Sequence, residues 1–511
     1  MRLVILHNCM NQTYLRNKFP FAVSVLQPLK CSLFVSLQKT YRGVKMSKQF
    51  NSKWGFILAC VGSAVGMANV WGFPYRMAAN GGGAFLIAYL CFVVLFSFVG
   101  LSAEYAVGRK ARTGTLGAYT MVWKSRRMEK AGKAIGWLPL AGSLCIAFGY
   151  AVIIAMVLRG FTSSLTGSLF NSYAAEEVIE AGKTVVKTGS EKWFGEVAFK
   201  PYSLVWFHAA IVIGTLLTLI LGAKSIEKTN KIMMPLFFIL FVILAVRVAF
   251  LPGAVEGYKY MFIPQWEYLL KPATWIWAMG QAFFSLSITG SGMIVYGAYL
   301  SDDEDVISGA VSTAIFDTIA ALVAALVIIP ASFSFNAAEI AAAKAAGLPL
   351  HSVINRGPGL LFVTLPEILK TIRFGRIFAV ILFVAVVFGG VSSLQNMFEA
   401  VGESLMHRFP RLKRNAMLVL LAVLCFGIGV NMEAIYQWGT WMDIVSIYII
   451  PIGAVLGGFS WFWIMKKDDI LNAVNLGASR KAGSLWHNLG RWLYVPLAAL
   501  ICIAGFFVGG F

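Results

Sequence analysis

The chain has 511 residues, of which 59% are hydrophobic and only 13% are charged, against about 25% charged residues in typical soluble domains. This composition excludes an ordinary water-soluble protein and indicates a polytopic membrane protein. The net charge of +20 is not a signal for nucleic acid, because the positive residues lie in short segments between apolar stretches, where they orient a membrane chain. Neither the seven cysteines nor the five histidines have the spacing of a disulfide framework or a metal site.

The first 45 residues differ from the rest of the chain. They contain seven Lys or Arg and no Asp or Glu, a composition that resembles a basic targeting arm. Met46 lies directly before the first long apolar stretch, and we favour it as the true start. We expect residues 1–45 to be disordered and a chain that begins at Met46 to be sufficient.

Stretches of about 20 residues without Asp, Glu, Lys or Arg are candidates for membrane-spanning helices. Nine stretches satisfy this rule, and two more carry one charge each, Arg247 and Asp317. We therefore predict an all-α polytopic membrane protein with about eleven transmembrane helices. The predicted spans are residues 54–75, 84–103, 134–158, 204–223, 232–249, 272–301, 306–333, 377–398, 415–432, 444–465 and 492–511.

The segments between the spans predict the orientation. Residues 109–133 hold eight Lys or Arg, residues 224–231 hold three and residues 407–414 hold four. These segments follow spans two, four and eight, so they lie on one side, which the positive-inside rule identifies as the cytoplasm. The acidic segment 301–305 disagrees, but acidic residues weigh little in this rule. We expect a protein of the inner (cytoplasmic) cell membrane with a cytoplasmic N-terminus and an extracytoplasmic C-terminus.

Two sets of five spans precede the last one. Because five is odd, the second set enters the membrane from the opposite side, which permits the inverted repeat of transporters with a broken first helix in each half. Spans one and six fit this pattern, since GSAVGMANVW (62–71) and FSLSITGSG (284–292) are rich in Gly and small polar residues. Close helix packing would also account for such glycines. We predict one transporter domain (46–511), with repeats at about 50–250 and 271–465 and an extra helix at about 490–511.

A helix that unwinds in mid-membrane leaves carbonyl and amide groups that lipid cannot satisfy. Carbonyl and hydroxyl oxygens are hard donors suited to Na⁺, and the positive N-terminal end of a half-helix attracts a carboxylate. An amino acid with accompanying Na⁺ meets both demands. No covalent chemistry is predicted, so we do not expect an enzyme.

Several motifs resemble the neurotransmitter:sodium symporter family, in its bacterial amino-acid branch. The resemblance extends from about residue 50 to the last span and implies sodium-coupled symport of an amino acid into the cell by alternating access, with Na⁺ co-transported and no organic cofactor. The motifs are GSAVGMANVW (62–71), NGGGAF (80–85), LPGA (251–254), QAFFSLS (281–287) and GPGLLFVTLP (357–366).

The resemblance also implies site residues, with Tyr150 binding the substrate carboxylate and Phe284 closing over the pocket as a lid. The first sodium site would use Ala64, Asn69, Ser285 and Asp317. The second would use Gly62, Val65, Gly389, Ser392 and Ser393. The substrate would contact Ala64, Gly66, Ile146, Tyr150, Phe284, Ser285, Ser287, Gly290, Asn396 and Met397.

The sequence departs from the family at the gates. Gly72 occupies the position of an arginine that normally pairs with the gate residue Asp443, so Arg76 is a candidate substitute. His407 lies where an acidic residue of the inner gate is expected. Gly290 replaces a bulky residue and is expected to enlarge the pocket. Asp317 occupies a position that is Asn in many chloride-dependent animal relatives, and an ionised Asp317 would make chloride unnecessary.

Several of these residues also fit purely structural roles. Tyr150 and Asn69 are compatible with packing and helix–helix hydrogen bonds, the two serines with bonds inside their own helix, and Glu104 and Glu399 with structural bonds to neighbouring helices. A proton-coupled carrier of the same fold and a slow-transporting amino-acid sensor are the alternative functions. The expected partners are an amino acid, Na⁺ and the lipid bilayer, without nucleic acid, and the oligomeric state stays open.

Overall fold

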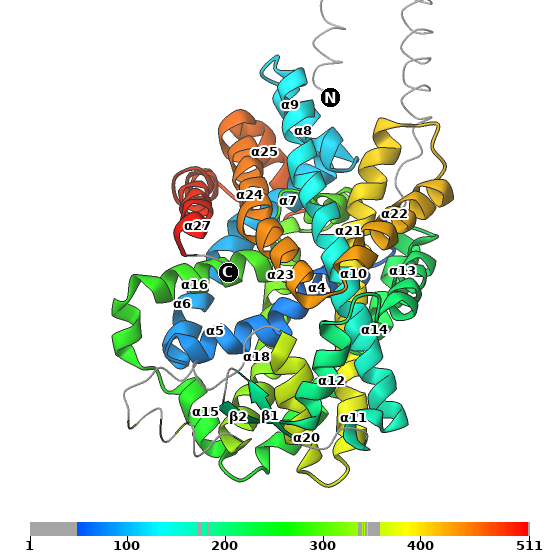
Figure 1. Ribbon diagram of the computed structural model, residues 1–511. Coiled ribbons are helices and arrows are strands. Elements are labelled where there is room, and N and C mark those ends of the chain that lie inside the picture. Colours follow the sequence, from blue (N-terminus) through cyan, green and yellow to red (C-terminus); the bar gives the residue numbers. More distant parts are fainter. Residues whose placement is uncertain are drawn as a thin grey trace, which may run out of the picture. The chain divides into compact units, whose positions relative to one another are not determined.

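The structure is a computed structural model that describes residues 49–171, 176–180, 183–335, 340, 342, 345 and 358–508. In this part of the chain nearly every regular element is helical, which confirms the predicted fold class (Figure 1). One β-hairpin was not predicted, in which β1 (Glu176–Glu180) pairs with antiparallel β2 (Lys183–Lys187). The segment 1–45, for which we predict disorder, and Gly357 of the fifth motif lie outside the described residues.

The elements follow one another in chain order. Up to residue 270 the helices are α4 (Lys53–Ala64), η1 (Ala68–Gly72), α5 (Phe73–Ala79), α6 (Gly83–Leu95), η2 (Phe96–Leu101), α7 (Ser102–Ala111), α8 (Thr115–Lys124), α9 (Glu129–Ile135), α10 (Trp137–Thr166), α11 (Ser168–Asn171), α12 (Gly189–Ala198), α13 (Val205–Leu219), α14 (Ala223–Ala249), α15 (Ala254–Phe262) and η3 (Trp266–Leu270). The later helices are α16 (Pro272–Ser285), α17 (Gly292–Ala298), α18 (Val306–Phe335), η5 (Leu360–Thr364), α20 (Leu365–Lys370), α21 (Gly375–Arg408), α22 (Arg414–Gly429), η6 (Val430–Met432), α23 (Ile435–Asp443), η7 (Ile444–Ile449), α24 (Ile450–Phe459), η8 (Ser460–Ile464), α25 (Lys467–Asn475), α26 (Ser484–Leu489), η9 (Gly490–Tyr494) and α27 (Val495–Val508).

Within the described residues, each of the eleven predicted apolar stretches contains at least one helix, but the count of eleven spans is not confirmed. By length and composition, the described residues contain eight helices able to cross a membrane, or nine if the bent pair Lys53–Ala64 and Ala68–Ala79 forms one span. The other two predicted stretches hold α13, which has only 15 residues, and the separate helices α16 and α17. Exposed Ile239, Val242 and Val246 on α14 are typical of a face that lies against lipid.

The first predicted helix is broken. α4 ends at Ala64, because Val65 has an extended backbone with φ −70° and ψ 105°. The next helix begins at Ala68 and is inclined by 60° to α4. A Cβ at Gly66 would lie 2.1 Å from the Tyr150 hydroxyl, so only glycine allows this close approach of the chain to α10.

The sixth predicted span is broken in the same manner. α16 ends at Ser285 and α17 begins at Gly292. Between them, Ser287 and Gly290 adopt positive φ angles of 52° and 72°, which interrupt the helix. Oε1 of Glu104 on α7 accepts the Gly290 amide at 2.8 Å. The two breaks therefore confirm the predicted broken helices, and one buried acid stabilises the second.

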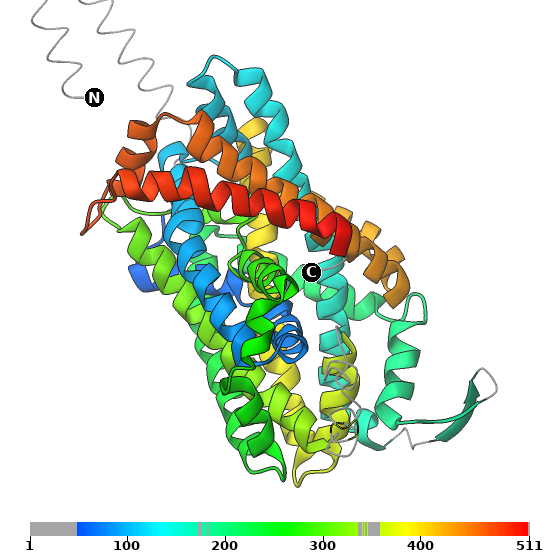
Figure 2. The ribbon, with the colours of Figure 1, turned by 90° about the vertical axis from the view of Figure 1, so that its left-hand side faces the viewer.

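Two long helices, α10 and α21, pack along each other beside the first break (Figure 1). Their close approach depends on glycines, since a Cβ at Gly160 would meet Phe383 at 2.7 Å and one at Gly390 would meet Ile154 at 2.7 Å. α21 also contacts α4 and α14. α27, in red in Figure 2, contacts α24 elsewhere in the bundle. The boundaries of the two repeats stay predictions.

Candidate functional site

A first polar cluster lies beside the break after α4. Asn69 Nδ2 donates to Asp317 Oδ1 at 2.8 Å and to Ser285 Oγ at 3.1 Å, and Ser285 Oγ donates to Asp317 Oδ2 at 2.6 Å. All three side chains are fully buried. The structure thus brings together three residues predicted for the first sodium site from η1, α16 and α18. Ala64, the fourth, is the last residue of α4.

A second cluster joins the end of α4 to α21. Ser392 Oγ lies 2.7 Å from the Gly62 carbonyl and 2.9 Å from the Gly389 carbonyl. Ser393 Oγ lies 3.2 Å from the Gly62 carbonyl, 3.1 Å from that of Val65 and 3.1 Å from that of Gly389. All five predicted residues therefore meet. Because both hydroxyls reach across to α4, their bonds are not confined to α21.

A small cavity of about 50 Å³ lies beside the break after α4, and Ser393 of the second cluster lines it. Its lining includes eight of the predicted substrate-binding residues, namely Ala64, Gly66, Ile146, Tyr150, Phe284, Ser287, Asn396 and Met397. Ser285 belongs to the first cluster instead. Seven further residues complete the lining: Ser63, Ala68, Ser143, Thr289, Gly292, Ser393 and Ile450.

Gly290 does not line this cavity, in contrast to our prediction. A Cβ on Gly290 would lie 2.5 Å from the Gly453 carbonyl and 2.7 Å from the Tyr119 hydroxyl, so the residue faces α8 and α24. Its glycine is explained by its positive φ and by this close packing. The expectation that Gly290 enlarges the substrate pocket is therefore wrong.

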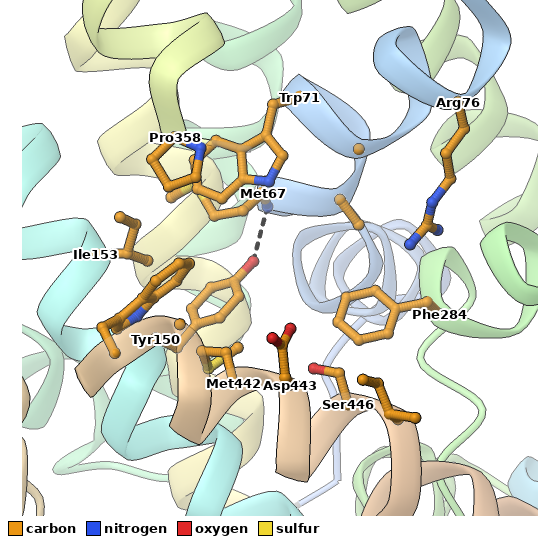
Figure 3. Close-up of a pocket in the computed structure, with 15 residues that line it drawn as sticks. Met67, Trp71, Arg76, Tyr150, Ile153, Phe284, Pro358, Met442, Asp443 and Ser446 are labelled. Atoms are coloured by element: carbon orange, nitrogen blue, oxygen red, sulfur yellow. Dashed lines mark hydrogen bonds between the residues drawn. The ribbon is translucent and has the colours of Figure 1, made fainter. Parts of the chain in front are cut away.

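Tyr150 and Phe284 separate the small cavity from a larger one of about 280 Å³, because both side chains line both spaces. The Tyr150 hydroxyl accepts the Met67 amide at 2.8 Å (Figure 3). This bond uses an oxygen lone pair and leaves the hydroxyl hydrogen as a donor. Tyr150 thus has a polar role at the break, beyond packing.

The larger cavity contains both predicted outer-gate groups. Figure 3 shows the Asp443 carboxylate pointing into it between Tyr150 and Phe284. Arg76 also lines it, but its Nη1 donates to Gln281 Oε1 at 2.5 Å and its guanidinium lies 5.4 Å from the centre of the Trp277 ring. Arg76 and Asp443 form none of the ion pairs of the described residues, so the gate is not joined by charge in this conformation.

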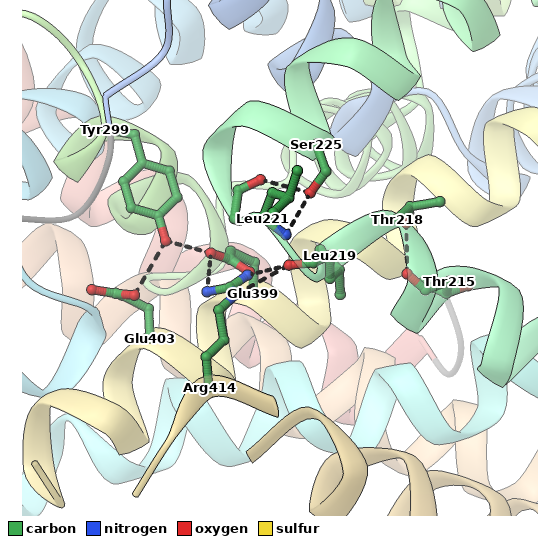
Figure 4. Close-up of polar contacts among 10 residues, drawn as sticks. Thr215, Thr218, Leu219, Leu221, Ser225, Tyr299, Glu399, Glu403 and Arg414 are labelled. Atoms are coloured by element: carbon green, nitrogen blue, oxygen red, sulfur yellow. Dashed lines mark hydrogen bonds and ion pairs between the residues drawn. The ribbon is translucent and has the colours of Figure 1, made fainter. Parts of the chain in front are cut away.

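A third polar cluster lies where α21 and α22 meet (Figure 4). Arg414 forms an ion pair with Glu399, with an Nη2–Oε2 distance of 2.6 Å, and donates to the Leu219 carbonyl at 2.7 Å. The Tyr299 hydroxyl donates to Glu399 and, at 3.2 Å, to Glu403. This cluster ties the loop before α18 to α21 and α22. It lies on the predicted cytoplasmic side, where His407 replaces the expected acid.

Some polar contacts of the site were not predicted. The Tyr89 hydroxyl approaches Ser285 Oγ at 3.4 Å, and Asn230 contacts Gly62 from α14. A tyrosine or asparagine inside an apolar helix gives no periodic signal, so only spatial proximity identifies them. The structural roles considered for Glu104 and Glu399 are confirmed by their bonds to Gly290 and Arg414.

Comparisons with known proteins agree with this geometry. A model of the Sodium:neurotransmitter symporter family matches residues 47–192 and 176–508. An uncharacterised sodium-dependent transporter of Bacillus subtilis (strain 168) is 30% identical over 469 residues, which make up 89% of this chain and 96% of that protein. The sodium-dependent serotonin transporter of Drosophila melanogaster is 26% identical over 506 residues, which make up 92% of this chain and 78% of that protein.

A solved structure is similar over nearly its whole length. The crystal structure of MhsT in complex with L-phenylalanine matches with a TM-score of 0.73 and 29% sequence identity. The match covers 90% of this chain and 99% of that one.

The third cluster predicts a stability effect. Arg414→Met leaves the Glu399 carboxylate, which is 1% exposed, without its cation, and breaking a buried pair costs about 3–5 kcal/mol. Arg414→Met should therefore lower the apparent unfolding temperature in detergent, and a double Glu399→Gln/Arg414→Met variant should recover part of the loss. Lys110→Met breaks the exposed pair with Asp469 and serves as the control, with little effect expected. Equal unfolding temperatures for Arg414→Met and Lys110→Met would contradict this role.

Proposed function

This chain belongs to the Sodium:neurotransmitter symporter family, and from that premise we propose that it carries a neutral amino acid into the cell with Na⁺ by alternating access. The family consists of sodium-dependent transporters and not of enzymes, and its members are multi-pass membrane proteins. The observation that carries the proposal is the convergence of two polar clusters on the break after α4, which a small cavity adjoins.

The donor chemistry of the clusters supports two sodium sites. The second cluster gathers three carbonyl and two hydroxyl oxygens from α4 and α21. The first offers the Ser285 hydroxyl and the Asp317 carboxylate, to both of which Asn69 donates through Nδ2. Asn69 Oδ1 accepts the Gly66 amide at 3.1 Å, and it is the oxygen that Asn69 contributes in the proposed site. Hard oxygen donors of this kind suit hard cations. In the proposed assignment, Ala64 and Val65 contribute backbone carbonyls to the first and second site respectively.

The small cavity supports a neutral amino acid as substrate. The lining contains no Lys, Arg, Asp or Glu among the described residues, so a charged side chain would be buried there without a partner, at high cost. Ile146, Met397 and Ile450 supply apolar surface. Ala68 begins η1 and lines the cavity, which directs the positive end of that half-helix at a substrate carboxylate. The solved structure of MhsT, which is similar to this chain, contains MhsT in complex with L-phenylalanine.

The difference between the two sides of the site supports alternating access. On the side of Asp443, a cavity of about 280 Å³ reaches Tyr150 and Phe284. On the other side, the Tyr299, Glu399 and Arg414 cluster ties the helices together. In the proposed cycle, release of the substrate into the cell requires the residues of this cluster to move apart while the larger cavity, which we call the outer cavity, closes. In the proposed orientation, with the N-terminus inside, the cluster lies on the cytoplasmic side of the site.

Asp317 supports coupling without chloride. Its carboxylate is fully buried, and its described partners are the neutral groups of Asn69 and Ser285. A buried carboxylate without a cationic side chain is costly, and a Na⁺ ion in the first cluster compensates its charge. We propose that Asp317 supplies the negative charge that chloride supplies in many animal relatives.

Uptake into proteoliposomes tests the proposed function. An inward Na⁺ gradient should drive accumulation of radiolabelled neutral amino acids, whereas choline or a proton gradient should not. Asn69→Ala and Ser393→Ala each leave polar groups undersatisfied, at a cost of about 1–3 kcal/mol. At about 1.4 kcal/mol per decade, the Na⁺ concentration for half-maximal uptake should rise about fivefold or more in both variants.

Ser332→Ala is the matched control, because Ser332 is a buried serine whose one side-chain bond to a described residue is to the Ile328 carbonyl within α18. Its sodium dependence should equal that of the unmodified chain. Accumulation driven by protons, or binding without accumulation, would refute the symport proposal in favour of a proton-coupled carrier or a sensor. Unchanged sodium dependence in both Asn69→Ala and Ser393→Ala would refute the site assignment.

The role of Asp317 predicts the chloride dependence. Uptake by the unmodified chain should persist when gluconate replaces chloride, because a fixed carboxylate beside the first site repels an anion. Asp317→Asn should be inactive or become stimulated by chloride, as measured by uptake in both salts. Asp305→Asn, which removes a carboxylate in the loop before α18, should change neither property. Chloride-dependent uptake by the unmodified protein would exclude this role.

A further inference from the structure

A hydrogen-bond relay fixes the orientation of the Asn230 amide on α14. Thr229 Oγ1 donates to the carbonyls of its own helix, Ser225 at 2.9 Å and Ile226 at 3.1 Å, so toward Gln395 it acts only as an acceptor. Gln395 Nε2 donates to it at 3.0 Å, which turns Gln395 Oε1 toward Asn230. Asn230 Nδ2 then donates to that oxygen at 2.8 Å and to the Ile226 carbonyl at 2.9 Å. The amide oxygen of Asn230 must therefore point the other way.

That oxygen is buried and has no hydrogen-bond donor among the described residues. The nearby ammonium group of Lys231 is engaged by Glu227, at 2.6 Å. The relay joins α14 to α21, but it leaves a buried acceptor unsatisfied, which destabilises the folded chain. A bound cation would satisfy this unpaired oxygen, which the relay holds in a fixed direction.

The oxygen points at the second cluster. A Cβ on Gly62 would lie 2.1 Å from Asn230 Oδ1 and 2.9 Å from Ser392 Cβ, so both side chains approach the same glycine from α14 and α21. Ser392 and Ser393 both donate to the carbonyl of Gly62, as they do to that of Gly389. Only a residue without a side chain at position 62 permits this approach.

The cluster contains five oxygens, those of the Gly62, Val65 and Gly389 carbonyls and of the two serine hydroxyls. Hard cations commonly take six or more oxygen ligands in proteins, as magnesium and calcium do. We propose that the amide oxygen of Asn230 is a sixth ligand, which binds Na⁺ together with this cluster. The inference rests on the proposed second sodium site and adds α14 to the helices that the ion holds together.

Direct binding of ²²Na⁺ to the purified full chain, without substrate and at constant ionic strength with K⁺, tests the proposal. Asn230→Leu keeps the size of the side chain but removes its oxygen, and should raise the half-saturating Na⁺ concentration about three- to tenfold. Asn230→Asp keeps an oxygen and adds charge, and should bind Na⁺ at least as tightly as the unmodified chain. Thr229→Val removes the end of the relay, so the amide is free to turn, and should weaken Na⁺ binding although Thr229 itself does not reach the ion.

The unfolding temperature in Na⁺ and in K⁺ separates a ligand from a structural acceptor. If Asn230 is a ligand, Asn230→Leu should lower the unfolding temperature more in Na⁺ than in K⁺, relative to the unmodified chain. Equal losses in both salts with unchanged ²²Na⁺ affinity would overturn the proposal and indicate that the oxygen only binds water or packs against Gly62.

Ser393→Ala distinguishes this failure from failure of the site itself. Weakened binding in Ser393→Ala with normal binding in Asn230→Leu would leave the second site intact and exclude Asn230 as a ligand. Normal binding in both variants would exclude the second site and the sixth ligand together.

Discussion

Two helices that stop inside the bundle are the constraint on which the rest of the structure depends. In a low-dielectric environment a backbone carbonyl or amide without a partner costs several kcal/mol, so each break requires polar groups from neighbouring helices. At the first break Ser392, Ser393 and Asn69 meet this need, and at the second Glu104 does. The polar groups that stabilise the breaks are also those that give the protein its oxygen-rich sites, so fold and function share one physical cause.

The buried acids Glu104 and Asp317 have different roles, one at a break and one at an oxygen-rich site. Glu104 accepts a backbone amide of the segment between α16 and α17 and so holds a fixed strained loop in place. Among the described residues, the Asp317 carboxylate accepts from two neutral side chains of the first cluster and from no cationic one, which leaves its charge to be compensated by a bound cation in the proposed mechanism. In the proposed mechanism, therefore, Na⁺ is part of the folded core: it joins η1 to α18 at the first site and α4 to α21 at the second. Loss of the ion then loosens the contacts that separate the outer cavity from the cytoplasmic side.

The broken helices and the all-α membrane fold could be predicted because both leave signals in the amino-acid sequence. Apolar stretches of span length reveal helices, and Gly-rich segments with small polar residues reveal breaks. The resemblance to the family brought Asn69, Ser285, Asp317 and both serines into one prediction, although their roles as ligands stay predictions. The prediction that Gly290 enlarges the substrate pocket failed, because Gly290 faces Gly453 and Tyr119 instead. The sequence does not reveal which way a single residue of a nonhelical segment points. The Glu399–Arg414 pair depends on a tertiary contact that no periodicity encodes, and the hairpin at 176–187 lies outside the apolar stretches that were used for prediction.

The central claim is that sodium and substrate stabilise the same arrangement of the first break, and their thermodynamic linkage tests it most directly. Coupling between two binding sites is reciprocal and typically amounts to about 1–3 kcal/mol. Equilibrium binding of a radiolabelled neutral amino acid to the purified chain should therefore be at least about tenfold tighter in NaCl than in KCl, and that amino acid should tighten ²²Na⁺ binding by the same factor. Equal amino-acid affinity in the two salts would contradict the account.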